Sequence, residues 1–272
     1  MGFILPGGTA TQQLELALVA EEAGWDGVFV WEGAYGVDAW SLLAAIAVRT
    51  ETVRLGTMLT PLPWRRPWKV ASQVATLDQL SRGRAILTVG VGAFTDDLPR
   101  TGEEEDLRTR AAMLDDGIDL IRALWSGERT FQGQTAAYRF EATDQLSVAR
   151  PVQERVPIWV VGVWPRMKSM RRVLRCDGIV PQFAGGGHRG SPDRVREMRA
   201  WLVENGARPD LDVVAEGQTP ADPREAWATV APWADAGCTW WMESNWEMPH
   251  HSAERMEQVR RRLMSGGPTL AT

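Results

Sequence analysis

Short apolar runs alternate along the chain with longer stretches in which apolar residues recur at helical spacing. Apolar runs rich in β-branched residues and separated by helical segments are typical of parallel strands joined by crossover helices. The strands that we expect are Gly2 to Leu5, Gly27 to Trp31, Val53 to Thr60, Ala85 to Val91, Ile158 to Val161, Gly178 to Val180, Leu211 to Ala215 and Thr239 to Met242. The pattern therefore predicts eight strand and helix units.

A segment with a helical period follows each expected strand. The helices that we expect are about Thr11 to Ala23, Asp38 to Arg49, Pro67 to Leu80, Leu107 to Trp125, Arg166 to Leu174, Pro192 to Asn205, Pro223 to Ala236 and Ser252 to Met264. Gly24 is placed to end the first helix, and Pro67 stands where a helix tolerates a missing N–H. Residues Phe131 to Phe140 fit none of these units, and Gly133 within them predicts a small hairpin inserted after the fourth helix.

Eight parallel units are the number that closes a (β/α)8, or TIM, barrel of the α/β class. Such barrels run to roughly 250 residues as one domain, so we expect one domain over residues 1–272. The near-continuous apolar runs at Ile158 to Val161 and Ala85 to Leu87 suit strands buried on both faces. An open doubly wound sheet is the alternative. It is disfavoured because no glycine-rich dinucleotide fingerprint follows the first strand.

Composition excludes several classes of protein. A net charge of −5 with 44% hydrophobic and 24% charged residues is ordinary for a globular chain. The like-charged runs at 103–106 and 260–262 are typical of solvated helix faces, so we expect no nucleic-acid partner. No apolar run approaches the roughly 20 residues that span a bilayer, and the amino terminus lacks a signal-peptide core. We expect a cytoplasmic protein without a membrane partner, and a homodimer is one assembly that we consider.

Carboxylates follow two of the expected strands, at the end of a barrel where active sites lie. Glu32 comes after the second strand and Glu243 after the eighth, and either could polarise or deprotonate a bound molecule. Tyr35 and Asp96, in the loops after the second and fourth strands, are weaker catalytic candidates. For each acid the alternative is a carboxylate at the rim that pairs with an arginine.

Two segments could bind a ligand through the backbone. Gly90-Val91-Gly92 follows the fourth strand, where glycines would let a flat molecule approach closely, although such glycines often serve only turns. The segment Gly162-Val163-Trp164-Pro165-Arg166-Met167-Lys168 joins a glycine turn to a helix start with two cations, which suits a phosphate. A plain strand-to-helix turn is the alternative for this second segment.

The chain has 14 tryptophans, and several of them fall at predicted strand ends. These are Trp31, Trp64, Trp164, Trp240, Trp241 and Trp246. A cluster of this kind predicts an aromatic-walled pocket for a planar ligand. The three histidines at 188, 250 and 251 lack the spacing of metal ligands, and no Gly-x-Ser-x-Gly elbow occurs, so we expect neither a metal site nor acyl-transfer chemistry.

Four stretches carry a family likeness. They are Ala23-Gly24-Trp25-Asp26-Gly27-Val28-Phe29-Val30-Trp31, Arg54-Leu55-Gly56-Thr57-Met58-Leu59-Thr60-Pro61-Leu62, Leu77-Asp78-Gln79-Leu80-Ser81-Arg82-Gly83-Arg84 and Val89-Gly90-Val91-Gly92. Together they resemble the bacterial luciferase-like family. This resemblance implies a (β/α)8 protein that uses reduced FMN or coenzyme F420, and the chain looks closest to the F420-type branch.

The resemblance also implies roles for particular residues. Thr57, Met58 and Thr60 would line the face of the cofactor ring, and Gly90 and Gly92 would admit its edge. The segment from Gly162 to Lys168 would hold the phosphate, and Glu32 would lie near the reactive centre. A non-proline cis peptide bond, which is frequent in this family, would fall at Thr57-Met58.

The sequence departs from the sugar-phosphate dehydrogenases of the family at two positions. Those enzymes have an acid followed by His where this chain has Glu32-Gly33, and Glu where it has Ala93, so glucose-6-phosphate dehydrogenase activity is not expected. We expect an enzyme that transfers hydride between F420, or reduced FMN, and a small apolar or conjugated organic substrate. The alternatives are an FMN-dependent monooxygenase that uses oxygen and a non-catalytic flavin-binding protein.

Overall fold

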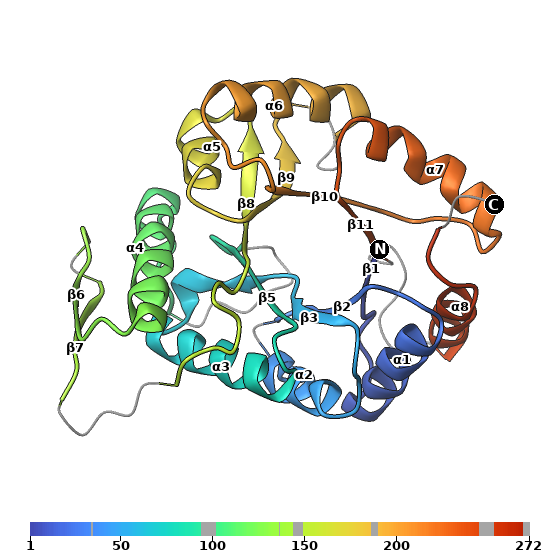
Figure 1. Ribbon diagram of the computed structural model, residues 1–272, viewed down its shortest axis with the longest axis horizontal. Coiled ribbons are helices and arrows are strands. Elements are labelled where there is room, and N and C mark those ends of the chain that lie inside the picture. The colour runs from blue at the N-terminus through green and yellow to red at the C-terminus, as the bar shows by residue number, and fades with distance from the viewer. Residues whose placement is uncertain are drawn as a thin grey trace.

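The strands form a closed parallel barrel ringed by helices (Figure 1). The computed structural model describes residues 1–33, 35–93, 102–135, 137–143, 149–185, 190–244 and 253–268. The barrel strands are β1 (Gly2–Ile4), β2 (Gly27–Val30), β3 (Arg54–Thr57), β4 (Thr60–Pro61), β5 (Ala85–Gly90), β8 (Ile158–Trp164), β9 (Gly178–Phe183), β10 (Asp212–Gly217) and β11 (Trp240–Glu243). Neighbours run in the order β3-β2-β1-β11-β10-β9-β8-β5-β4, and β3 also pairs with β5, which closes the ring. The predicted (β/α)8 barrel is confirmed.

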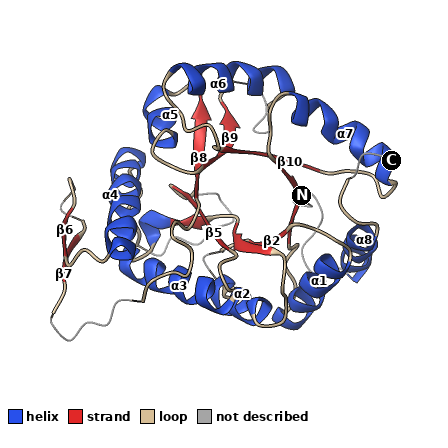
Figure 2. Ribbon diagram, viewed as in Figure 1, coloured by secondary structure: helices blue, strands red, loops and turns tan. Residues whose placement is uncertain are grey.

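Helices cover the outside of the barrel on all sides (Figure 2). They are α1 (Ala10–Glu22), α2 (Ala39–Ala47), α3 (Pro67–Leu80), α4 (Leu107–Ser126), α5 (Met167–Val173), α6 (Pro192–Glu204), α7 (Pro223–Asp235) and α8 (Ala253–Met264), with a short 3-10 helix η1 at Leu62–Trp64. Thr9 and Gln12 form a capping box at the start of α1, and Gly127 ends α4 in the left-handed conformation. No helix in these described ranges has both the length and the apolar character needed to cross a membrane.

Large side chains fill the inside of the barrel toward the amino-terminal ends of its strands. Phe29 stacks on Trp159 with ring centroids 5.5 Å apart, and Trp240 meets Trp159 edge-on at 5.3 Å. Trp159 is fully buried, and its Nε1 donates to Asp212 Oδ2 at 3.0 Å. Gly178 leaves the space for that indole, because a Cβ there would lie 2.3 Å from the ring. This plug fills the interior of the barrel below the carboxyl ends of the strands.

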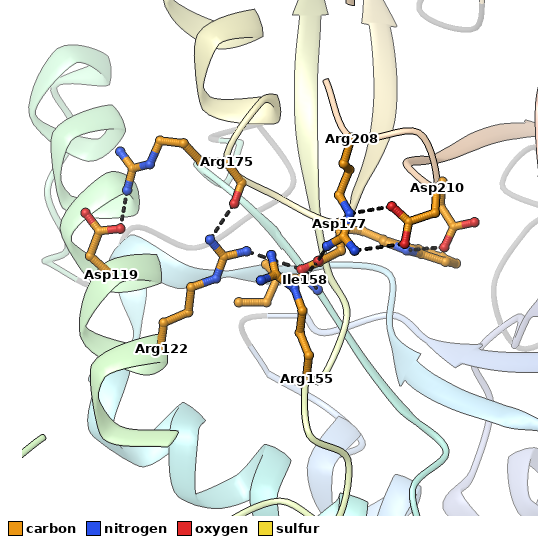
Figure 3. A network of polar contacts seen from close by, with 10 residues as sticks. Asp119, Arg122, Arg155, Ile158, Arg175, Asp177, Arg208 and Asp210 are labelled. Atoms are coloured by element: carbon orange, nitrogen blue, oxygen red, sulfur yellow. Dashed lines mark hydrogen bonds and ion pairs between the residues drawn. The ribbon is translucent and has the colours of Figure 1, made fainter. Parts of the chain in front are cut away.

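A network of ion pairs lies where β8 and β9 begin (Figure 3). Asp177 immediately precedes β9, and its carboxylate accepts the N–H of Ile158, the first residue of β8, at 3.0 Å. Arg122 and Arg155 pair with the same carboxylate at 3.2 Å and 2.5 Å, and Arg208 completes the set. In barrels of this type the amino-terminal end serves stability rather than catalysis, and a network around a buried carboxylate suits that role.

The predicted insertion is a two-stranded antiparallel hairpin of β6 (Thr130–Gln132) and β7 (Arg139–Glu141), which stands beside α4 outside the barrel (Figure 1). Asp116 of α4 holds its turn, because the carboxylate accepts the N–H groups of Gln134 at 3.0 Å and Thr135 at 2.7 Å.

The expected third strand is interrupted, and the fifth is longer than expected. The chain leaves the sheet between β3 and β4, and the cis peptide bond there is Met58-Leu59, one residue beyond the expected Thr57-Met58. β8 continues to Trp164 rather than ending at Val161, because Gly162, Val163 and Trp164 pair with β9. A second cis bond precedes Pro165.

Candidate active site

A cavity of about 430 Å³ lies at the carboxyl ends of the barrel strands. Its walls come from the ends of β2, β4, β5, β8, β9 and β10 and from the residues that follow them. The lining residues are Trp31, Glu32, Gly33, Met58, Leu59, Pro61, Trp64, Gly90, Val91, Gly92, Ala93, Val161, Val180, Gln182 and Glu216. A mostly apolar hollow with a few polar groups is the usual form of a small-molecule site.

Tryptophans and glycines shape one side of this cavity. Trp31 and Trp64 both line it, as the sequence predicted for an aromatic-walled pocket. Gly92 has a φ of +75°, and a Cβ there would lie 2.8 Å from the Trp64 ring. A Cβ on Gly90 would lie 3.1 Å from Leu59. Glycine is therefore required at 92 by both backbone conformation and space, whereas at 90 a side chain would press on Leu59.

Three other predicted tryptophans, at 164, 240 and 241, do not line the cavity. Trp164 packs outward against Trp201 of α6 with centroids 6.1 Å apart. Trp240 belongs to the aromatic plug, and Trp241 is buried under α7. Trp246 lies outside the described residues, as do the three histidines.

Glu32 is held by three donors at the wall of the cavity. Its Oε2 accepts the Thr60 hydroxyl at 2.5 Å and the Trp40 indole N–H at 3.2 Å, and its Oε1 pairs with Arg65. Arg65 is in turn fixed by Gln73 of α3 at 3.0 Å. Burial raises the pKa of the Glu32 carboxyl, and the donors from Thr60, Arg65 and Trp40 act in the opposite direction. A carboxyl with a raised pKa in a cavity is a candidate for acid–base work.

Thr57 and Thr60 support Glu32 instead of facing the cavity. Their hydroxyls lie 2.8 Å apart, both side chains are fully buried, and Thr60 continues the chain of hydrogen bonds to Glu32. Neither residue is among those that line the cavity, which corrects the expected contact of both with a cofactor face. Met58, the third residue of that expected set, does line it.

Glu243 points away from the cavity into the layer between the barrel and α8. The Glu243 carboxylate accepts hydrogen bonds from the Thr219 N–H at 2.8 Å and from the Thr219 hydroxyl at 2.6 Å. Arg262 Nη2 lies 3.5 Å from its Oε2. The side chain is 1% exposed and is absent from the cavity lining. The structure thus corrects the expected catalytic placement, and Glu243 is the arginine-paired carboxylate that the sequence left as its alternative.

Of the two weaker catalytic candidates, the structure describes only Tyr35, which is not brought to this site. Tyr35 is 96% exposed and does not line the cavity. Asp96 lies outside the described residues.

The segment expected to bind phosphate starts inside a strand rather than at a glycine turn. Gly162 packs toward α5, because a Cβ there would lie 2.9 Å from Val173 of that helix. The N–H of Val163 donates to Ser169 at 3.0 Å, so it is already satisfied. Arg166 and Lys168 are exposed just beyond the carboxyl end of β8, on the same side of the barrel as the cavity.

Sequence reasoning did not select four residues that the structure places at or beside this site. Gln182 and Glu216 line the cavity near the ends of β9 and β10, in parts of these strands that lie beyond the expected ends. Each stands two residues after an inward-facing valine. Because side chains on one face of a strand recur every second residue, this spacing could have identified both residues from the sequence. Trp40 and Arg65 reach Glu32 from α2 and from the residue after η1, and no local pattern indicates that contact.

Acidic groups are the only charged side chains among the described residues that line the cavity, namely Glu32 and Glu216. No group of three His, Cys, Asp or Glu residues is arranged to hold a metal in the part of the chain that the structure describes. The site therefore favours uncharged or cationic molecules within the cavity itself.

The fold and the cavity define the class of protein, which is a (β/α)8 barrel with a small-molecule cavity at the carboxyl ends of its strands. The chain belongs to the luciferase-like monooxygenase family, whose model matches residues 3–269. The resemblance seen in the sequence is thus confirmed.

Individual relatives share part of this chain. A protein of Mycobacterium tuberculosis, named provisionally as a coenzyme F420-dependent oxidoreductase (Rv3520c), is 30% identical over 231 residues, or 75% of this chain and 60% of the relative. The F420-dependent glucose-6-phosphate dehydrogenase of Nakamurella multipartita is 33% identical over 156 residues, or 54% of this chain and 44% of that enzyme. The chain therefore spans less than two thirds of the length of these relatives.

Solved structures share the fold. The coenzyme F420-dependent tetrahydromethanopterin reductase of Methanopyrus kandleri superposes with a TM-score of 0.74 over 98% of this chain and 97% of that chain, at 15% sequence identity. At this level of sequence identity the similarity shows a shared fold and nothing further.

Proposed function

We propose that the chain is an F420-dependent oxidoreductase that transfers hydride between coenzyme F420 and a small uncharged organic substrate in the barrel cavity. The observation that carries this proposal is the cavity itself, with apolar and glycine walls and one buried carboxylate, Glu32, held at its edge. The names of the relatives, several of which state F420 dependence, supply the cofactor. Reduced FMN is the alternative cofactor.

The residues around the cavity fit a planar ring system. Met58, Leu59, Val161 and Val180 offer apolar surface, and Gly90 has no side chain to obstruct a flat molecule. F420 would supply the hydride chemistry, while the protein binds and orients the reactants and excludes water. The exposed cations Arg166 and Lys168, at the same end of the barrel, would hold the charged tail of the cofactor.

Glu32 would act as the acid or base that moves a proton at the reacting centre. Thr60 and Trp40 both donate to Oε2, and Arg65 donates to Oε1, so Oε1 keeps one lone pair for a bound molecule. Its raised pKa brings proton transfer closer to neutral pH than an ordinary glutamate would allow.

The substrate would be apolar or conjugated rather than phosphorylated. No cation lines the described part of the cavity, so a phosphate would find no cationic partner there. Gly33 and Ala93 stand where the sugar-phosphate dehydrogenases of the family have His and Glu, which points the same way. Activity on glucose 6-phosphate is therefore not part of the proposal.

Two measurements test the proposal. Titration with F420 and with FMN, followed by fluorescence quenching, should show tighter binding of F420. Oxidation of reduced F420 should then exceed the buffer rate with at least one member of a panel of enones, imines and aldehydes, and Glu32→Gln should lower kcat about 10²-fold or more. Tighter binding of FMN would overturn the cofactor assignment. Tight binding without any turnover would instead identify a non-catalytic flavin-binding protein.

A second candidate is an FMN-dependent monooxygenase, which the description of the matched family favours. Oxygen consumption by the protein with reduced FMN and an aldehyde or ketone separates the two functions. Substrate-dependent oxygen uptake that exceeds F420 turnover would support the monooxygenase.

A further inference from the structure

An arginine behind the cavity wall fixes the backbone at the end of β5. Arg110 extends from α4 and is 6% exposed. One nitrogen of its guanidinium, Nη1, donates to the carbonyl oxygen of Val91 at 3.0 Å and to that of Gly92 at 2.8 Å. Both carbonyls therefore point toward the same cation, on the α4 side of the loop.

Because each peptide bond is planar, the directions of these two carbonyls also fix the directions of the N–H groups in the same peptides. In a trans peptide the N–H points opposite to the preceding carbonyl, so the N–H groups of Gly92 and Ala93 face away from Arg110. Both residues line the cavity, whereas Arg110 does not. Within the described residues neither N–H group donates a hydrogen bond. Two neighbouring donors at the cavity wall thus face away from Arg110 and have no acceptor among the described residues.

The buried cation also strengthens these donors. A guanidinium that donates hydrogen bonds to two peptide carbonyls polarises those peptides, and polarised peptides donate more strongly through their N–H groups. Consecutive N–H groups of this kind form a concave site for a negatively polarised atom. Gly92, with its φ of +75°, gives the backbone the turn that such a site needs.

We propose that the N–H groups of Gly92 and Ala93, positioned by Arg110, bind the carbonyl oxygen of the substrate, and that the substrates are therefore small uncharged ketones, aldehydes or enones. The inference rests on the proposed function for its reaction, because reduction at a carbonyl carbon places negative charge on that oxygen. Binding of the oxygen itself does not depend on the cofactor. Arg110 acts as a positioning residue that does not contact the substrate.

Binding to the cofactor-free protein tests the proposal separately from the proposed function. Cyclohexanone and methylenecyclohexane have similar shapes, and only the ketone has an oxygen acceptor. Carbonyl-¹³C valine with ¹⁵N glycine selects the amides of Gly90, Gly92 and Gly162, the three glycines that follow valine. We expect cyclohexanone, and not the hydrocarbon, to shift the Gly92 amide proton downfield, while Gly162 serves as an internal control because it packs toward α5.

Variants of two buried arginines complete the test. Arg110→Met should lower the ratio of ketone to hydrocarbon affinity about fivefold or more, since about 1 kcal/mol is at stake in a hydrogen bond of this kind. Arg172→Met is the matched control, because Arg172 is 8% exposed and bonds Ala111 and Asp115 away from the cavity. An unshifted Gly92 amide at saturation, or an equal ratio in Arg110→Met and the native protein, would overturn the proposal. The proposal would also be overturned if Arg110→Met lost affinity for F420 while the ratio of ketone to hydrocarbon affinity stayed unchanged, since the donors would then serve the cofactor.

Discussion

The guanidinium of Arg65 and the carboxylate of Glu32 form an ion pair at the wall of the barrel cavity. The carboxylate is almost fully buried, whereas Arg65 is partly exposed and braced by Gln73. Arg65 does not itself line the cavity, but its charge affects the protonation of Glu32.

Replacement of Arg65 by Met should move the alkaline limb of the pH–rate profile for substrate reduction to higher pH, because in that direction Glu32 must be protonated to donate a proton. Burial already raises the pKa of Glu32, and Arg65 is one of the groups that lower it. Loss of the cation therefore raises this pKa further, so the protonated form that donates to the substrate persists to higher pH. The measurement is kcat/KM against pH for oxidation of reduced F420. Arg65→Lys keeps the charge and should keep the profile near that of the native protein, whereas an unshifted limb in Arg65→Met would argue against Glu32 as the titrating group.

Replacement of Glu243 by Leu should lower the free energy of unfolding by about 3 kcal/mol, because it leaves the buried Arg262 without its carboxylate. Urea denaturation measures the change. Glu257→Leu is the control, since Glu257 and Arg261 form an exposed pair whose loss should change stability by less than about 1 kcal/mol. Because Glu243 lies outside the cavity, turnover per folded molecule should stay near the native value, and a large fall in kcat of the folded variant would show that Glu243 takes part in catalysis.

Replacement of Gly92 by Ala should weaken cofactor binding as well as stability. The added Cβ would lie 2.8 Å from the Trp64 ring and would displace part of the cavity wall. Gly185 has a φ of +83° with nothing within 4 Å, so Gly185→Ala carries the backbone penalty alone, about 1 kcal/mol. Thermal unfolding and F420 titration of both variants separate the two effects. Equal F420 affinity in the two variants would show that the Trp64 contact does not shape the site.

Both cysteines should resist alkylation in the folded protein at pH 8. Burial raises the pKa of Cys176 to about 11 and that of Cys238 to about 12, so neither thiol forms much reactive thiolate. Iodoacetamide labelling followed by mass spectrometry should find both residues unmodified in buffer and both modified in denaturant. Rapid native labelling of Cys176 would contradict its buried position between α5 and β9.

The order of elements was predictable because it rests on local periodicity. Apolar runs and helical spacing identified the barrel units and the hairpin after α4 without any knowledge of contacts. Strand ends were predicted less well. Pro181 reads as a stop in the sequence, yet β9 continues through it to Phe183, since Pro181 pairs with Gly162 within the parallel ladder.

The sequence by itself determined that a barrel forms and that Glu32, Gly90 and Gly92 stand at the carboxyl ends of its strands, where the cavity lies, because strand order and strand direction follow from local pattern. Only the tertiary structure decided which side chains face the cavity. In the run Trp240-Trp241-Met242 every residue is apolar, so the sequence cannot say which of them points inward, and Met242 inside the barrel places Glu243 outside. Likewise, Thr60 and Arg65 meet Glu32 across about thirty residues of chain, a contact that barrel closure creates and no local pattern specifies.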